Sequence, residues 1–126
     1  LLAAGGAAVE SVEVDARAVV EANRRGPALG VRRHAGSAED MVSTLKPAEL
    51  VITNPPRTGM DARVSDAIVA ARPRRIAYIS CDPATLARDL ARILPRFPAS
   101  QPKLRAFDLF PQTAHVETVA ILEAAG

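Results

Sequence analysis

The chain has 126 residues, 48% of them hydrophobic, which suits one small globular domain and excludes an intrinsically disordered protein. Its single cysteine excludes an internal disulfide framework and fits a reducing compartment such as the cytoplasm, and no apolar run is long enough to span a membrane. The net charge of +2 and the pI of about 9.2, with 14 arginines among 16 cations, permit contact with phosphate groups without requiring it.

Short β-rich runs alternate with helical patterns, which indicates an α/β fold with a mostly parallel sheet. The opening residues resemble the end of a helix stopped by Gly5 and Gly6, so we expect further sequence upstream of Leu1. No linker or repeat interrupts the pattern, and residues 1–126 are therefore expected to form one domain. In chain order, we expect strands at 9–14, 31–35, 50–53, 76–80, 104–109 and 116–122, and helices at 16–25, 38–45, 61–71 and 83–94.

Cys81 lies where an apolar strand pattern stops and a helix start begins. Asp82 is typical of an N-cap and Pro83 of the first helical position. The reactive form of cysteine is the thiolate, which unpaired N–H groups at a helix start stabilise, whereas the Asp82 carboxylate opposes this effect. Cys81 is therefore a candidate nucleophile, with a small buried apolar residue as the alternative.

Polar residues follow the ends of several predicted strands. Glu13, Asn54 and Cys81 each stand at a carboxyl end, the edge at which open α/β sheets bind ligands. Residues 110–115 are short enough for a hairpin, and if the preceding strand is parallel to the others, Glu117 begins its return strand close to Cys81. A carboxylate beside a thiol is an arrangement of nucleophile and base.

The run Asn54-Pro55-Pro56-Arg57 has two prolines that fix the backbone and hold the Asn54 side chain towards a cleft. The alternative is a rigid turn that merely ends the strand. Glu13 is similarly open to two interpretations, a carboxylate that accepts hydrogen bonds from a ribose or a solvated surface group.

His115 is a candidate proton carrier or orienting residue, or else a hydrogen-bonding residue of the loop. Neither histidine has metal-ligand spacing with Cys81, so no metal site is expected. A basic cluster, either a solvated surface or a contact for RNA phosphate, comprises Arg72, Arg74 and Arg75.

Three segments together resemble the RNA uracil-5-methyltransferase family, whose members use S-adenosylmethionine. They are NPPRTG at residues 54–59, SCDPATLARD at 80–89 and FPQTAHVE at 110–117. Their order and spacing match the catalytic half of that family. The resemblance covers residues 9–122, nearly the whole chain.

This resemblance implies a Rossmann-like class I methyltransferase sheet, mostly parallel with a C-terminal antiparallel hairpin. It implies that Cys81 attacks C6 of a uracil extruded from transfer or ribosomal RNA, that C5 then takes a methyl group, and that Glu117 removes the C5 proton. It further implies that Glu13 and Asn54 bind the cofactor. Asn54, Arg57 and His115 are the expected substrate-binding residues.

The chain departs from the family at Asn54, where the family usually carries Asp. A neutral amide can hydrogen-bond a base edge, but it cannot act as a carboxylate. An Asn-Pro-Pro motif also occurs in amino-methyltransferases, in which the Asn contacts an exocyclic amine. Base N-methylation is therefore an alternative, although it leaves Cys81 and Glu117 without a role.

The resemblance also implies that the family's first strand and Gly-rich cofactor loop would lie before Leu1, and that this strand belongs in the middle of the sheet. The 126-residue chain alone is therefore expected to bind the cofactor poorly and to be inactive. A further alternative is a non-catalytic remnant that binds a nucleotide or RNA.

Overall fold

The structure is a computed structural model, which describes residues 2–25, 30–45, 47–99, 101–109, 111–113 and 115–125. The chain forms two compact units, Leu1–Leu45 and Lys46–Gly126. Each unit has its own parallel or mixed sheet with flanking helices. That both belong to a single domain stays a prediction.

The first unit contains a two-stranded parallel sheet. Strand β1 (Val9–Glu13) pairs along its length with β2 (Val31–Ala35), with Glu13 opposite Ala35. Helix α1 (Ala16–Arg25) connects them and buries Val19. At the start of the chain, the helix that the sequence predicts to stop at the two glycines is a 3-10 helix, Ala3–Gly5, which ends at Gly6 in the left-handed conformation.

The second helix of this unit is shorter than the sequence predicts. Helix α2 covers only Ala38–Met41 and continues as a 3-10 helix, Val42–Thr44. The predicted helix over 38–45 was wrong in its second half because Val, Ser and Thr have low helix propensity. The Thr44 hydroxyl donates to the Met41 carbonyl at 2.7 Å, a local bond that competes with the α-helical pattern.

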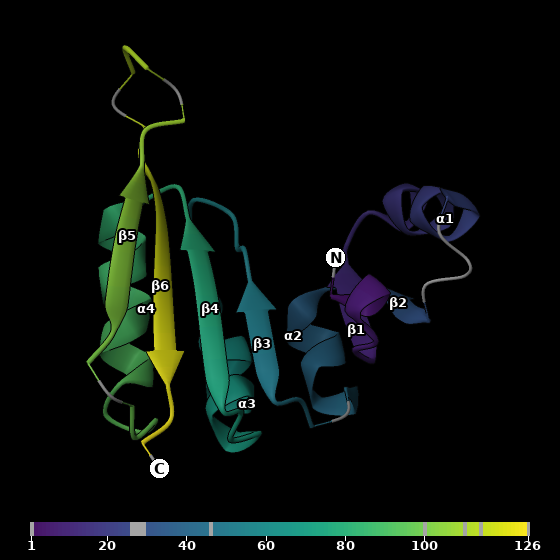
Figure 1. Cartoon of the computed structure of the whole chain (residues 1–126), viewed down its shortest axis with the longest axis horizontal. Coiled ribbons are helices and arrows are strands. Elements are labelled where there is room, and N and C mark those ends of the chain that lie inside the picture. The colour runs from purple at the N-terminus through teal and green to yellow at the C-terminus, as the bar shows by residue number, and fades with distance from the viewer. Residues whose placement is uncertain are drawn as a thin grey trace. The chain divides into compact units, whose positions relative to one another are not determined.

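The second unit is built on a four-stranded sheet with the order β3-β4-β6-β5. Strand β3 (Leu50–Thr53) is parallel to β4 (Arg75–Ser80), and β6 (Glu117–Glu123) is antiparallel to both β4 and β5 (Lys103–Phe107). The predicted C-terminal hairpin is confirmed, and its return strand lies between β4 and β5. As the arrows in Figure 1 show, β3, β4 and β5 run in one direction and β6 opposes them.

Helices α3 (Ala62–Ala70) and α4 (Pro83–Ile93) cover one face of this sheet (Figure 1). In β4 the alternate residues Ile76, Tyr78 and Ser80 point to that face and are buried. The core between the helices and the sheet comprises Met60, Val64, Ile68, Ile76, Tyr78, Leu86, Leu90, Ile93, Phe97, Ala120 and Leu122.

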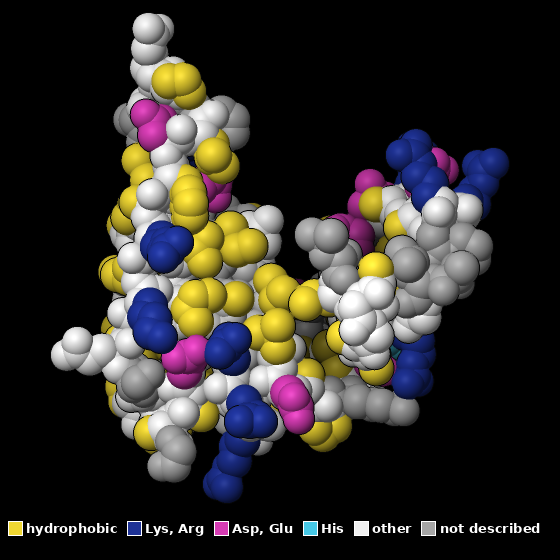
Figure 2. Space-filling model, viewed as in Figure 1, with side chains coloured by type: hydrophobic (Ala, Val, Ile, Leu, Met, Phe, Trp, Pro, Cys, Tyr) yellow, Lys and Arg dark blue, Asp and Glu magenta, His cyan; other side chains and the backbone are white. Residues whose placement is uncertain are grey.

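The opposite face of the β3–β6 sheet carries exposed apolar side chains. Ile52 pairs with Ala77 and Phe107 with Glu117, and this register places all four on the face away from the helices. Figure 2 shows hydrophobic side chains gathered over this face, with basic and acidic side chains towards one end of the strands.

Candidate active site

The candidate catalytic residues of the second unit meet at one edge of its sheet. Asn54 directly follows β3, and Cys81 directly follows β4. Ser80 pairs with Thr118 at the end of the β4–β6 ladder, so Cys81 and Glu117, their direct neighbours in sequence, both lie next to this last pair. Glu117 is itself held in register by its pairing with Phe107. The sheet therefore brings a thiol, a carboxylate and an amide to one edge.

The turn that carries Cys81 is held by local hydrogen bonds. The Ser80 hydroxyl donates to the Asp82 carbonyl at 2.9 Å and accepts from the Asp82 N–H at 3.1 Å. Cys81 between them is a free thiol of intermediate exposure. These hydrogen bonds keep the thiol at the edge of the sheet rather than in the core. This position does not support the alternative that Cys81 is a small buried apolar residue.

Asp82 caps helix α4, as the sequence predicts, and Pro83 is the first helical residue. Asp82 Oδ1 accepts from the N–H groups of Thr85 and Ala84, both at 2.9 Å. The Thr85 N–H, with that of Ala84 and the charge of Arg57, holds the pKa of Asp82 below its usual value. The ionised carboxylate therefore accepts hydrogen bonds from two of the N–H groups at the start of α4.

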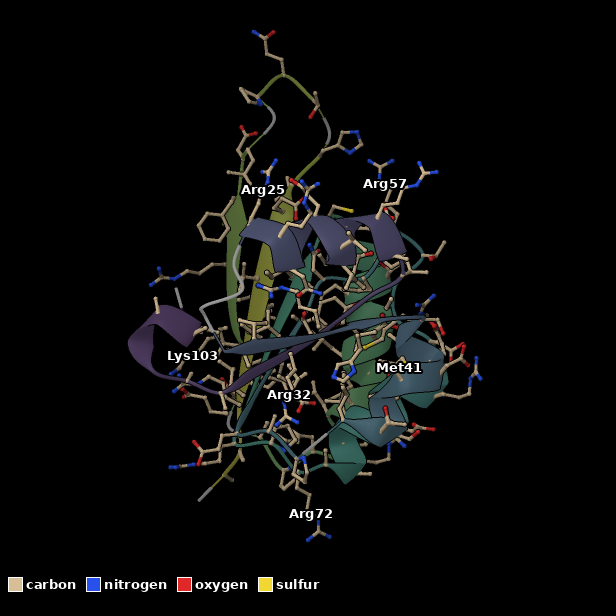
Figure 3. The ribbon with its side chains drawn as sticks, turned by 90° about the vertical axis from the view of Figure 1, so that its right-hand side faces the viewer. Arg25, Arg32, Met41, Arg57, Arg72 and Lys103 are labelled. Atoms are coloured by element: carbon tan, nitrogen blue, oxygen red, sulfur yellow. The ribbon has the colours of Figure 1, made fainter. Side chains whose placement is uncertain are left out.

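Arg57 connects two loops at the same edge. Its Nη2 contacts the His115 imidazole, 3.1 Å from Nε2, and both side chains are exposed. The backbone N–H of His115 donates to the Thr113 hydroxyl at 3.2 Å. Figure 3 shows Arg57 at the end of the unit from which the β5–β6 loop extends. Phe110 and Ala114, which belong to the predicted loop, lie outside the described residues.

Asn54 is exposed, and among the described residues its amide has no hydrogen-bond partner. Its donor and acceptor are thus available to a ligand, as the two following prolines lead one to expect.

Glu13 belongs to the other unit, where it ends β1. Its Oε1 accepts from the Asp15 N–H at 3.0 Å, which orients an exposed carboxylate at the end of the strand.

The predicted basic cluster lies elsewhere in the second unit. Arg75 begins β4, at the opposite end from Cys81, and forms an ion pair with Glu123 at 2.6 Å. Figure 3 shows Arg72 at the end of the unit opposite to Arg57. This position favours a solvated, ion-paired surface over a role at the candidate site.

Among the residues that the structure describes, no group of three or more His, Cys, Asp or Glu side chains is placed to hold a metal ion. No helix in the part of the chain that the structure describes has the length and apolarity to cross a membrane.

Sequence reasoning assigned no role to Asp89, which is fully buried beside this edge. A signal was present, because an acid stands in the apolar stripe of helix α4 between Leu86 and Leu90.

Comparisons with known proteins support the motif-based interpretation. Residues 24–125 match the family model of the tRNA (uracil-5-)-methyltransferases. An uncharacterized RNA methyltransferase of Gloeobacter violaceus is 41% identical over 128 residues, covering 97% of this chain and 27% of the relative. One of Porphyromonas gingivalis is 53% identical over 74 residues, covering 59% of this chain and 16% of the relative.

The solved structures agree in fold. The tRNA (uracil-54, C5)-methyltransferase of Pyrococcus abyssi, determined in complex with S-adenosyl-L-homocysteine, superposes with a TM-score of 0.81 at 29% identity, covering 96% of this chain and 29% of that one. TrmN from Thermus thermophilus has a TM-score of 0.66 at 20% identity, covering 93% of this chain and 36% of that one, and shows the fold alone. The chain, which spans between 16% and 36% of the length of these relatives, belongs to the tRNA (uracil-5-)-methyltransferase family.

Proposed function

We propose that the full-length gene product methylates C5 of a uracil in transfer or ribosomal RNA, with Cys81 as nucleophile and Glu117 as base. The observation that carries the proposal is the β4–β6 register, in which Cys81 and Glu117 follow the Ser80–Thr118 pair. A nucleophile and a base beside the same ladder pair can act on C6 and C5 of one ring, which are adjacent atoms.

The reaction begins when the Cys81 thiolate adds to C6, which places the electron pair of the C5–C6 double bond on C5. Bound S-adenosylmethionine supplies the methyl group that C5 takes. Glu117 then removes the proton from C5, the C5–C6 double bond re-forms, and the bond between C6 and Cys81 Sγ breaks. The thiolate is regenerated, and the proton remains on Glu117 until solvent takes it.

Two residues are suited to hold the cofactor. The Glu13 carboxylate is exposed, oriented by the Asp15 N–H and able to accept from ribose hydroxyls. The amide of Asn54, which has no hydrogen-bond partner among the described residues, can bind the cofactor or the edge of the target base.

RNA is the proposed partner, in keeping with a cytoplasmic protein. Ring addition needs access above and below the base, so the target uridine is in a loop or is extruded. Arg57 and His115 stand exposed at the same edge as Cys81, where a guanidinium can contact the phosphates on either side of an extruded nucleotide.

The test uses the full-length protein, S-adenosylmethionine and RNA that contains 5-fluorouridine. Fluorine at C5 cannot leave as a proton, so a covalent RNA–protein adduct should accumulate and be detected by denaturing mass spectrometry. Cys81→Ala should form no adduct, while Glu123→Gln, a carboxylate change at the far end of β6, should form it like the unaltered protein.

Two other outcomes would redirect the assignment. Because Asn54 stands where the family usually has Asp, base N-methylation is the second candidate function; nucleoside analysis would then show an N-methylated base and no adduct. RNA binding with neither methylation nor adduct, in a folded protein shown to bind S-adenosylmethionine, would favour a non-catalytic remnant.

A further inference from the structure

Asp89 is a charged residue inside the core of the second unit. Its side chain is fully buried, on the face of helix α4 that also buries Leu86, Leu90 and Ile93. A buried carboxylate is costly unless charged or hydrogen-bonding groups surround it. The partners of Asp89 therefore indicate what this acid holds together.

Both oxygens of the carboxylate are occupied. Oδ2 accepts from the Tyr78 hydroxyl at 2.6 Å and from the Met60 N–H at 2.7 Å. Oδ1 accepts from Arg88 Nε at 3.0 Å and Nη2 at 2.8 Å, and Arg92 Nη1 lies 3.6 Å away. Burial raises the pKa of a carboxyl group, but the donors on Tyr78, Met60 and Arg88 outweigh it and hold the pKa of Asp89 below its usual value.

These partners come from three segments that border the candidate site. Met60 ends the loop that begins at Asn54, Tyr78 lies on β4 three residues before Cys81, and Asp89 is on the helix that starts just after Cys81. Arg88 makes a second connection, since its Nη2 also donates to the Thr58 carbonyl at 2.8 Å. One carboxylate and its neighbouring guanidinium thus join the loop over residues 54–60 to the strand and helix on either side of Cys81.

The loop backbone approaches these groups as closely as a glycine permits. Gly59 has φ +80 and donates to the Pro56 carbonyl at 2.8 Å. A Cβ at this position would lie 2.3 Å from Arg88 Nη2 and 2.7 Å from Asp89 Oδ2. The turn therefore packs directly against the carboxylate and leaves no room for a side chain at residue 59.

We propose that Asp89 is a positioning residue, which fixes the loop over residues 54–60, and with it Asn54 and Arg57, relative to Cys81. A negative charge is needed because only hydrogen-bond donors surround the carboxylate, and two of them belong to the Arg88 guanidinium. A neutral amide of the same shape would turn its own N–H donors towards these donors. The effect on the reaction rests on the proposed function, whereas the effect on the loop does not.

The decisive variant is Asp89→Asn in the full-length protein, with Ile93→Val as a matched control. Ile93 is a fully buried residue of the same helix, and its truncation weakens packing without touching the loop contacts. Two quantities are measured well below the melting temperature of every variant. One is the rate of adduct formation with 5-fluorouridine RNA, and the other is hydrogen exchange of the backbone over residues 54–60.

We expect Asp89→Asn to lower the rate at saturating RNA by roughly 10- to 100-fold, because misplacement of a positioning loop has effects of that order. The RNA concentration at half-maximal rate should change by less than about threefold, since phosphate contacts spread over the protein dominate RNA affinity. Exchange at Met60 should rise as its acceptor is lost. Ile93→Val should alter neither quantity by more than about twofold.

Equal behaviour of Asp89→Asn and Ile93→Val in both measurements would overturn the proposal and leave Asp89 a merely structural acid. If Asp89→Asn does not fold, Tyr78→Phe takes its place, because it removes one hydrogen-bond donor and keeps the carboxylate. Tyr78→Phe should show the same changes in adduct rate and loop exchange to a smaller degree. Unchanged loop exchange in Tyr78→Phe would overturn the proposal. If the unaltered protein forms no adduct yet Asp89→Asn frees the loop, the proposed reaction fails and the positioning role stands.

Discussion

Cys81 directly follows Ser80 and Glu117 directly precedes Thr118, the two residues that form the last pair of the β4–β6 ladder. Cys81 and Glu117 are 36 residues apart in sequence, yet the antiparallel register brings them to one sheet edge. A nucleophile and a base that act on neighbouring atoms of one pyrimidine ring need such neighbouring positions.

Glu117→Gln should trap the enzyme on ordinary uridine RNA. The amide cannot take the C5 proton, so the methylated ring should stay bound to Cys81 and turnover should fall at least about 100-fold. Denaturing mass spectrometry would show the protein with RNA and one added methyl group. Glu123→Gln, on the same strand and face, should turn over normally. Normal turnover in Glu117→Gln would remove Glu117 from the mechanism.

Gly59→Ala and Gly30→Ala form a matched pair at two glycines with positive φ. Both substitutions incur the backbone cost of a left-handed alanine, about 1 kcal/mol. At Gly30 an added Cβ meets nothing within 4 Å, whereas at Gly59 it meets Arg88 and Asp89. Gly59→Ala should therefore lower the free energy of unfolding by about 2 kcal/mol more than Gly30→Ala. Equal losses in urea unfolding would contradict the close packing of this turn.

Asp89→Asn should destabilise the protein in a pH-dependent manner. The folded pKa of Asp89 lies below the ordinary value of 3.8, so the ionised group stabilises the fold above that pH, and this contribution is lost as the pH falls through the folded pKa. At pH 7 the substitution should cost about 3 kcal/mol, because it leaves buried donors and a guanidinium without their charged partner.

The gap in unfolding free energy between the unaltered protein and Asp89→Asn should be smaller at a pH below 3.8 than at pH 7, because the unaltered Asp89 loses the same charge as the pH falls through its folded pKa. Asp66→Asn is the control, since Asp66 is an exposed acid paired with Arg96 at 2.6 Å. Its substitution should change stability by less than about 0.5 kcal/mol at either pH. A gap of the same size at both pH values would mean that the Asp89 charge is not what stabilises the fold.

Arg57→Gln should weaken RNA binding and reduce its dependence on salt. Loss of one phosphate contact to a single-stranded segment lowers the slope of log K against log salt by about 0.7. Arg72→Gln, at the other end of the unit, should leave both affinity and slope unchanged. Fluorescence anisotropy with a labelled RNA hairpin at several salt concentrations measures both. Equal effects of the two substitutions would indicate diffuse attraction rather than a contact at the candidate site.

Local patterns predicted the elements of this protein closely. The bounds of the predicted strands and of the longer helices agree with the structure to within about two residues, as usual where periodicity and end signals coincide. Asp82 and Pro83 marked the start of α4 because capping depends on residues only two or three apart. Helix α2 was overestimated because its weak propensity was not offset by packing.

The motifs, read along the chain, also sufficed to indicate the family and to name Cys81, Asn54 and Glu117. Their meeting at one edge depends on strand order, and β6 pairs with β4 only through contacts between distant parts of the chain. Sequence periodicity shows which face of a strand is buried but not which strand lies beside it. The role of Asp89 likewise depends on contacts between distant parts of the chain. Its place in an apolar stripe is explained only when folding brings Met60, Tyr78 and Arg88 to its two carboxylate oxygens.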